Sequence, residues 1–393
     1  MISFAYSFDK GFIKNIINNF FIPKSLIKAD LVKRSCFLYD RRNYKNLCSI
    51  LEKYSLQKII FCKPQNFKSI SIGIFSELPI LADFYHPACI FKNAMVDDSI
   101  LTLKGSAAQN AYTSSYINVV LELKRMQVTY NSYRSGFLYN ELIRNPNVST
   151  LKKIIRKVKL LQTVGAKLTK MQISEYPEWV GLFQKIFDYE DLSKCFGYDI
   201  VKSSKLEVCP YCNAEDIRLI EGDKKHRPDI DHFLPKSKYP FFATSLYNFI
   251  PAGAACNRSF KRDVDLINGY IHPLLQGIEK VRLFDFSYID VEEKVTIELN
   301  DIPAFNLNVK LFELHAVYKH RKYYQRYLEL RKVYQEVLLI LAKGDISRKK
   351  ELMETFFHTN KSYRVMKDKK FEAEALHHII EKFELVSQQL GRS

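Results

Sequence analysis

Residues 209–261 contain the densest group of side chains that could bind a metal ion or transfer a proton. Thiolates are ligands for zinc, carboxylate and amide oxygens suit magnesium or manganese, and an imidazole can accept a proton near neutral pH. In chain order these residues are Cys209, Cys212, Asp231, His232, Asn248, Cys256, Asn257 and Lys261. Together they suit the hydrolysis of a phosphodiester bond with the help of a cation.

Such hydrolysis requires an activated water molecule, a cation on the scissile phosphate and relief of charge on the leaving oxygen. His232 could take the proton of the water, because an imidazole with its ordinary pKa of about 6.5 is mostly neutral at pH 7. Asp231 and Asn257 offer hard oxygen ligands that suit Mg²⁺ or Mn²⁺. Asp229 is a second acid whose role the sequence does not define.

The adjacency of Asp231 and His232 restricts the backbone that can position them. Neighbouring side chains on a strand point to opposite faces, so both can reach one reaction centre only if the strand bends or ends there. Pro235 follows closely, and proline is excluded from the interior of a sheet. We therefore expect the strand to end just after His232.

The order of these motifs, CxxC, then DH, then an isolated Asn, then CNxxxK, resembles the HNH endonucleases in their ββα-metal form. The resemblance implies two strands followed by a helix that begins near Ala255 and carries Asn257. It implies that Asp231 and Asn257 bind one divalent cation, and that His232 is the general base. Asn248 resembles the middle motif residue, which orients the base through hydrogen bonds of the loop.

Basic residues surround the last part of this motif. Lys261 lies four residues after Asn257 and hence on the same face of a helix, where it could contact a neighbouring phosphate. Arg258 and Arg262 are further candidates for binding nucleic acid.

A zinc site is the least complete part of the resemblance. Related motifs often carry a second CxxC, but the position three before Cys256 is Gly253. With Cys209 and Cys212, three thiolates remain for a metal that prefers four ligands. Either His226, Cys195 or water completes the site, or no zinc binds and the three cysteines pack as small apolar residues.

The stretch DHFLPKSKYPFFATSLYNFIPAGAACN, with HPLL at 272–275, is more similar to HNH proteins of bacterial anti-phage systems than to homing enzymes. The Septu-type nuclease subunits are the nearest group. Some such proteins act beside a partner ATPase that senses invasion. The chain has no Walker-type glycine loop, so a nucleotide switch would lie on such a partner.

Composition favours a polyanionic partner. The formal net charge is +17 and the pI is about 9.3, and phosphate contacts supply most non-specific affinity for nucleic acid. The sequence has no stretch of about 18 uncharged apolar residues, which argues against a membrane protein. The first residues lack the pattern of a secretion signal, and eight cysteines without one suggest reduced thiols and the cytoplasm.

Periodicity predicts an α+β fold that is mostly helical. We expect a mixed α/β region at 1–110, a helical region at 111–195, the HNH module at 196–275, and short strands followed by helices at 276–393. Within 1–110 the expected strands are 56–62, 70–74 and 98–103, and a helix at 12–21 would end at Pro23. Later helices are expected at 114–126, 151–161 and 371–388 and strands at 281–286 and 295–299, with Gly344 as a helix C-cap.

Three functions follow from these observations. The leading hypothesis is a metal-dependent endonuclease that acts on DNA in phage defence or restriction. The alternatives are an RNA- or tRNA-cleaving toxin, which could be silent without its partner, and a catalytically degenerate subunit that only binds nucleic acid. Gly253 favours the last of these. Five histidines on the expected later helices form no recognisable metal spacing, and we interpret those helices as a scaffold or partner surface.

Overall fold

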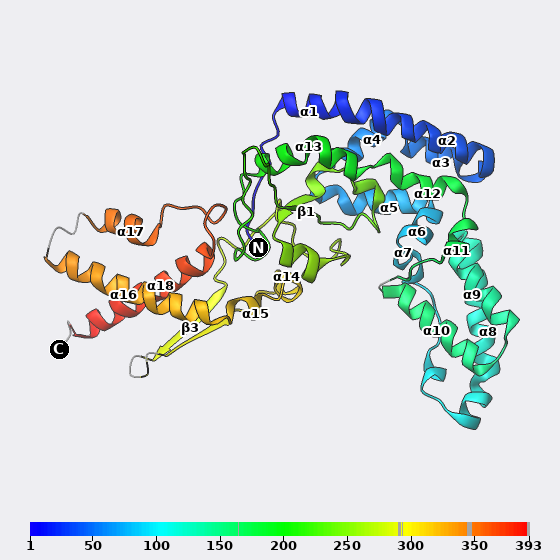
Figure 1. The fold of residues 1–393 in the computed structure, drawn as a ribbon. Coiled ribbons are helices and arrows are strands. Elements are labelled where there is room, and N and C mark those ends of the chain that lie inside the picture. Colours follow the sequence, from blue (N-terminus) through cyan, green and yellow to red (C-terminus); the bar gives the residue numbers. More distant parts are fainter. Residues whose placement is uncertain (164, 290–291, 293, 344–347, 391–393) are drawn as a thin grey trace. The chain divides into compact units, whose positions relative to one another are not determined.

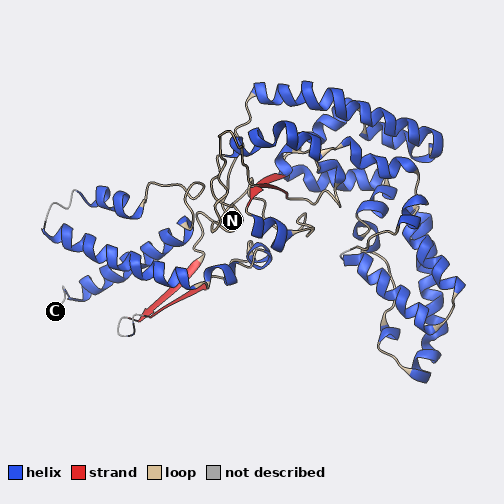
Figure 2. Ribbon diagram, viewed as in Figure 1, coloured by secondary structure: helices blue, strands red, loops and turns tan. Residues whose placement is uncertain are grey.

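The computed structural model describes residues 1–163, 165–289, 292, 294–343 and 348–390. These residues are mostly helical, with two small antiparallel sheets, which confirms the expected fold class at that level (Figure 2). The chain forms two compact units. Unit 1 contains residues 1–9, 193–233 and 247–393, and unit 2 contains residues 10–192 and 234–246. The four regions expected along the sequence stay a prediction.

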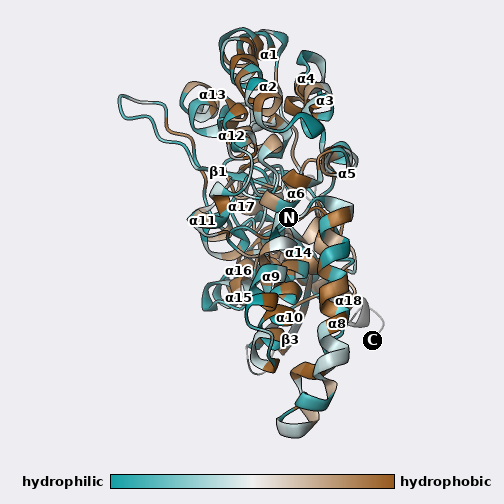
Figure 3. Cartoon of the chain, turned by 90° about the vertical axis from the view of Figure 1, so that its right-hand side faces the viewer, coloured by the Kyte–Doolittle hydropathy of each residue, from teal (hydrophilic) through white to brown (hydrophobic). Residues whose placement is uncertain are grey.

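Unit 2 is built from helices. They are α1 (Lys10–Ile16), η1 (Ile17–Leu26), α2 (Ile27–Tyr39), α3 (Arg41–Ile50), α4 (Lys53–Ile60), η2 (Pro64–Asn66), α5 (Phe67–Glu77), α6 (Pro79–Tyr85), α7 (Ala88–Phe91), η3 (Ser99–Leu101), α8 (Gly105–Tyr130), α9 (Tyr133–Arg144), α10 (Val148–Thr163), α11 (Lys170–Ser174) and α12 (Glu178–Ile186). The next helix, α13 (Tyr189–Ser204), carries the chain from unit 2 into unit 1. Figure 3 shows polar and apolar residues sharing these helices, as helices with one buried face require.

The helices expected at 114–126 and 151–161 are confirmed as parts of α8 and α10. In α10 the residues with helical spacing, Leu151, Ile154, Ile155, Val158 and Leu161, are all buried, so one apolar stripe faces the core. Trp179 on α12 is fully buried.

The segment between the two motif strands belongs to unit 2. Residues 234–246 include the short helix η4 (Pro240–Phe242), and Tyr239, Phe241 and Phe242 are almost completely buried. Their rings contact those of Phe67 and Phe75 in the same unit. Large buried aromatic side chains contribute strongly to a core, so this segment is part of the core of unit 2.

Unit 1 contains both sheets and the later helices. Its elements are β1 (Asp229–His232), η5 (Leu246–Asn248, which begins at the last residue of unit 2), β2 (Phe249–Ala252), η6 (Ala255–Lys261), β3 (Phe284–Ile289), β4 (Lys294–Leu299), α14 (Asn306–Leu311), α15 (Leu314–Tyr318), α16 (Arg321–Lys343), α17 (Lys349–Phe357) and α18 (Lys369–Leu390). β3 pairs with β4, and α16 lies beside α18 (Figure 1). The strand expected at 295–299 and the helix expected at 371–388 are confirmed as parts of β4 and α18, whereas the strand expected at 281–286 begins only at Phe284. Gly344, the expected C-cap, lies outside the described residues.

The strands expected within residues 1–110 are wrong. Residues 56–60 lie in α4 and residues 70–74 in α5, while residues 98–103 contain only the short helix η3. In α5 the buried residues are Phe67, Ser71, Ile74 and Phe75, which have helical spacing. Ile70, Ile72 and Ile74 also alternate with a period of two, and this alternation suggested a strand. A short apolar run does not distinguish the two structures, and tertiary packing decides.

The expected helix end at Pro23 is also wrong. Pro23 lies inside η1, which is a π-helical segment that continues into α2. Proline lacks an N–H group and its ring crowds the preceding turn of an α-helix. The π-helical turn is wider than an α-helical turn, which gives the proline ring more room, and the helix continues past it. No described helix combines the length and apolar character that crossing a membrane requires.

Candidate functional site

A short antiparallel hairpin positions the acid-histidine pair. Asp231 lies opposite Ile250 and His232 opposite Phe249, and the Phe233 N–H donates to the Asn248 carbonyl at 2.8 Å. β1 ends at His232, which confirms the strand end expected from Pro235. Asn248 is fully buried next to this end, so the structure brings His232 and Asn248 to the same place in the hairpin.

His232 is 9% exposed, and its ring packs edge-on against the ring of Phe249 at 5.2 Å between centroids. Alternation along a strand places the side chain of His232 on the face opposite to that of Asp231. The imidazole therefore packs against one apolar ring and keeps only a small part of its surface exposed.

The helix η6 packs its polar side chains toward the other face of β1. Asp229 and Asp231 share that face because they are two residues apart on the strand. The Asn257 amide nitrogen donates to Asp229 Oδ2 at 3.1 Å, and the Arg258 guanidinium donates to both Asp229 oxygens at 2.7 and 2.6 Å. The Arg258 hydrogen bonds are the largest cause of the lowered pKa of Asp229. The sequence left the role of Asp229 open, and in the structure its carboxylate links β1 to η6 through these hydrogen bonds.

Lys261 and Asp231 form a buried ion pair. The two side chains are 1% and 3% exposed, and Lys261 Nζ lies 2.9 Å from Asp231 Oδ1. The same ammonium donates to the His232 carbonyl at 2.6 Å, and the Tyr211 hydroxyl donates to Asp231 Oδ2 at 2.6 Å. Each carboxylate oxygen of Asp231 therefore has a donor inside the protein.

Burial is the main influence on the ionisation of Asp231. It raises the pKa of this carboxyl, against the opposing effects of the Lys261 charge and of the hydrogen bonds from Tyr211 and Lys261. A buried carboxylate without a cation would cost several kcal/mol. Lys261 supplies that cation, which explains why a lysine is tolerated in the interior.

The candidate residues are thus partly brought together. Asp231 and Lys261 are in contact, and His232 is adjacent to Asn248, but the Asn257 amide donates to Asp229 and not to Asp231. The sequence suggested that Lys261 contacts a neighbouring phosphate. In the structure Lys261 is buried, and its ammonium contacts the Asp231 carboxylate instead. Arg262 is exposed and follows the last turn of η6, where its positive φ of 49° ends the helix.

The oxygen donors on this face suit a hard divalent cation. Asp231 supplies a carboxylate, and the Asn257 amide oxygen is not the atom that pairs with Asp229. In the structure the Lys261 ammonium lies against the carboxylate that such a cation would use. A divalent cation would therefore compete with Lys261 for Asp231.

His272, the next histidine in unit 1 after His232, should make the stability of the protein depend on pH. His272 packs on Phe233 at 4.1 Å between ring centroids, and burial lowers its pKa to about 3. An unfolded histidine binds its proton below a pH of about 6.5. As pH falls from 6.5 toward 3 the unfolded chain therefore gains a proton that the folded chain does not bind, and stability is lost, by up to about 5 kcal/mol.

We expect His272→Asn to flatten that loss. The shorter amide can still accept the hydrogen bond that the Leu274 N–H donates to His272 Nδ1, but it does not titrate. Unfolding midpoints would be compared between pH 7.5 and pH 5 for the wild type, His272→Asn and His315→Asn, an exposed control. Parallel pH profiles for the wild type and His272→Asn would contradict the assignment.

Three cysteines form the second part of the site. Cys209, Cys212 and Cys256 are buried, and their sulfur atoms all lie within 4.8 Å of one another. They come from the Cys-Pro-Tyr-Cys turn and from η6, so they connect the knuckle to the helix that carries Asn257 and Lys261. Among the described residues this is the group of histidine, cysteine and acidic side chains close enough to bind one metal ion.

The ionisation of the three thiols is coupled. Burial is the largest single influence and opposes ionisation of Cys209, but hydrogen bonds from the thiols of Cys212 and Cys256 and from the backbone of Gly253 and Cys212 together hold its pKa well below the usual value. The hydrogen bond to Cys209 is in turn the largest cause of the raised pKa of Cys212 and of Cys256. A thiolate among converging sulfur atoms is the donor set that zinc binds.

The side chains that sequence proposed as a fourth ligand are not in this group. His226 and Cys195 are both exposed and lie outside the cluster of mutually close sulfur atoms. Glu215 is hydrogen-bonded to both segments that carry the cysteines. Its carbonyl accepts from the Cys209 N–H at 2.9 Å, and its carboxylate accepts from the Ala254 N–H at 2.8 Å. The pKa of Glu215 is raised by burial and, next, by the charge of Cys209.

Sequence reasoning missed two contributors. Tyr211 lies inside the CxxC turn, stacks on Phe312 at 4.2 Å and donates to Asp231, so it joins the cysteine cluster to the acid. Glu215 lies three residues after Cys212 in the same turn. Position within the knuckle was the available signal for both residues.

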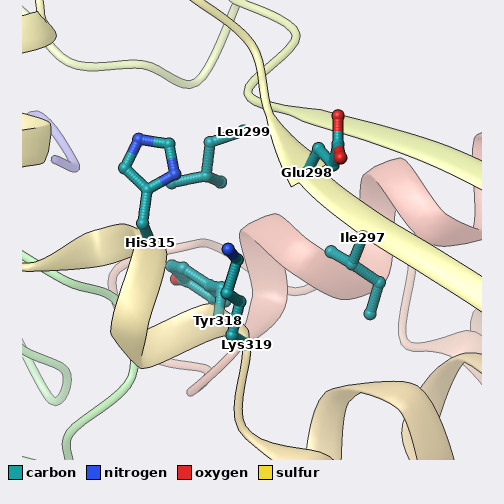
Figure 4. A pocket seen from close by; sticks show the side chains of 6 residues that line it. All are labelled: Ile297, Glu298, Leu299, His315, Tyr318 and Lys319. Carbon is teal, nitrogen blue, oxygen red and sulfur yellow. The ribbon is translucent and has the colours of Figure 1, made fainter.

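A separate cavity of about 230 Å³ lies between β4 and α15 (Figure 4). The side chains of His315, Tyr318 and Lys319 extend from the helix side, and those of Ile297, Glu298 and Leu299 from the strand. His315 belongs to no metal-binding group among the described residues. The interpretation of the later helices as a scaffold or partner surface stays a prediction.

Comparison with known proteins gives one partial match. The chain is 35% identical over 81 residues to "Protein ea31" of Escherichia phage lambda, covering 20% of this chain and 24% of that protein. The chain thus spans about a quarter of the length of the curated relative that it matches. No family model and no solved structure matches the chain.

Proposed function

We propose that this protein is an HNH-type endonuclease that hydrolyses phosphodiester bonds in DNA with a divalent cation. The observation that carries the proposal is the strand–loop–strand–helix arrangement of β1, β2 and η6. It places a histidine at the strand end, a buried asparagine beside it, and two acids of one strand against the polar face of the helix.

In the proposed reaction His232 accepts a proton from the attacking water. Asn248, which adjoins the strand end, orients the loop that presents His232. The Phe249 ring fixes one side of the imidazole and keeps it from turning into solvent. A positioned general base is worth about 10²–10⁴ in rate.

Asp231 and Asn257 are the residues that would hold Mg²⁺ or Mn²⁺. When bound, the cation would neutralise the phosphate and the leaving 3′ oxygen. Lys261 stabilises the acid in the absence of the ion, because it gives the buried carboxylate an opposite charge. The three cysteines would hold a structural zinc ion that fixes the start of η6 relative to the Cys-Pro-Tyr-Cys turn.

Nucleic acid is the substrate that charge favours. The net charge of +17 supports attraction to a polyphosphate, and Arg262 is exposed at the end of η6. Arg258 is 71% exposed although its guanidinium pairs with Asp229, so it too could meet a phosphate at the surface. DNA is preferred to RNA because of the resemblance of the motif to DNA-cleaving enzymes.

The decisive experiment is a cleavage assay with the purified chain. Supercoiled plasmid and total RNA would each be incubated with the protein in Mg²⁺, in Mn²⁺ and in EDTA. We expect nicking or cutting of the plasmid that needs the divalent cation. Cleavage of RNA alone would replace the DNA substrate with an RNA substrate, and cleavage that persists in EDTA would contradict a metal-dependent mechanism.

A second candidate function is a subunit that binds nucleic acid without cutting it. The Lys261–Asp231 ion pair favours it, because a tethered ammonium lies against the carboxylate of the proposed cation site. This function gives binding that weakens steeply with salt, and no cleavage in any divalent cation. Activity that appears only with the product of the neighbouring gene would instead indicate a partner, such as a defence ATPase, that activates the nuclease.

A further inference from the structure

We propose that Glu215 is the fourth ligand of the metal ion held by Cys209, Cys212 and Cys256. The carboxylate would complete a tetrahedral site of three sulfur atoms and one oxygen. The proposal rests on the structural-metal part of the proposed function and is independent of its nuclease part.

The three thiols need a fourth donor. Structural zinc sites are almost always four-coordinate, and a carboxylate oxygen is one of the ligands that zinc accepts. The sulfur atoms converge from two segments and are buried, so bulk water has little access to them. A donor from the protein must therefore come from the rim of the cluster.

Glu215 lies at that rim by virtue of the backbone. Its carbonyl bonds to the Cys209 N–H, which places the residue directly across the turn from the first cysteine. Its carboxylate bonds to the Ala254 N–H, in the turn that leads to Cys256. The side chain therefore bridges the same two segments that supply the three sulfur atoms.

Gly253 explains why the carboxylate can be there. A Cβ atom at position 253 would overlap the carboxylate of Glu215, so any side chain at this position would displace it. Position 253 precedes Cys256 by three residues, the spacing that separates Cys209 from Cys212. The carboxylate thus occupies the space in which a fourth cysteine side chain would lie, and glycine leaves that space open.

A small movement completes the site. The Glu215 oxygens are not among the atoms that lie within 4.8 Å of one another. The carboxylate must therefore turn about its own side-chain bonds, away from Ala254 and toward the sulfur atoms. The exchange replaces a hydrogen bond to a backbone N–H with a bond to a dication, which is the stronger interaction for a partly buried carboxylate.

The test measures metal and does not depend on cleavage. The wild type should contain one zinc ion per chain, and its X-ray absorption spectrum should fit three sulfur atoms and one oxygen. Glu215→Gln keeps an acceptor for the Ala254 N–H but removes the anionic oxygen. We expect zinc affinity, measured by competition with a chromophoric chelator, to fall by at least about 100-fold, because loss of an outer-shell partner that only orients a ligand already costs about 10- to 100-fold.

A swap of ligands gives the matched second variant. Gly253→Cys together with Glu215→Ala should restore tight binding and give a spectrum of four sulfur atoms. Asp216→Asn, a change at the exposed acid next in sequence, is the control and should bind zinc as the wild type does. Wild-type affinity in Glu215→Gln, an unchanged spectrum in that variant, or a wild-type protein that takes up no zinc would each overturn the proposal. A failure of the nuclease assay would leave these readouts unaffected.

Discussion

Replacing His232 with alanine should reduce DNA cleavage by about 10³-fold, within the range that a general base contributes. The proposed mechanism requires the imidazole at the end of β1 to accept the proton of the attacking water, which a methyl group cannot do. The side chain packs on Phe249 and takes no part in the Lys261–Asp231 ion pair, so the unfolding midpoint should change by only a few degrees. Initial rates on supercoiled plasmid and a thermal melt would be measured on the same preparation.

His315→Ala is the matched control for this change. His315 is an exposed histidine of the same unit, on α15, and its loss should leave both cleavage and stability unchanged. If His232→Ala cleaved DNA at the wild-type rate, the assignment of His232 as the general base would be wrong.

Replacing Lys261 with methionine should destabilise the protein by about 3–5 kcal/mol, because it leaves the Asp231 carboxylate buried without its cation. A divalent cation should then restore stability by taking the place of the ammonium. At a concentration of about 100 times its Kd, Mg²⁺ or Mn²⁺ would return about 3 kcal/mol. Chemical denaturation of Lys261→Met and the wild type, each with and without the metal, would measure both effects.

Lys370→Met provides a control that separates a cation site from a general salt effect. Lys370 is also buried, pairs with Glu374 at 2.6 Å and donates to two backbone carbonyls. Its loss should cost similar stability, with no recovery in Mg²⁺ or Mn²⁺. Equal recovery of both variants, or none in Lys261→Met, would show that Asp231 is not a ligand for the divalent cation.

The elements of the candidate site could be predicted from sequence because their signals are local. Pro235 indicates where β1 ends, and the resemblance of the motif order to HNH proteins implied the two strands. The cysteine spacing brought Cys209 and Cys212 together, and their convergence with Cys256 is confirmed. The end of β1 and the pairing of Cys209 with Cys212 each depend on residues within a few positions of one another.

The partners of the charged side chains could not be predicted in the same way. Asp231 and Lys261 are thirty positions apart, and nothing local distinguishes a lysine that meets solvent from one that is 1% exposed. The same holds for Asn257, whose partner proved to be Asp229. The wrong strands of α4 and α5 have a related cause, since four or five apolar residues satisfy both periods until packing selects one.

The path of the chain has a practical consequence for fragments. A fragment of residues 196–275, the module expected from the sequence, would retain β1, β2 and η6 but would lose the helices that bury Tyr239, Phe241 and Phe242. Three aromatic rings would then be presented to water on a single loop, a feature that promotes aggregation. The segment that carries the candidate site is therefore not expected to fold as an independent unit. Its excision or grafting onto another scaffold requires that the loop be redesigned first.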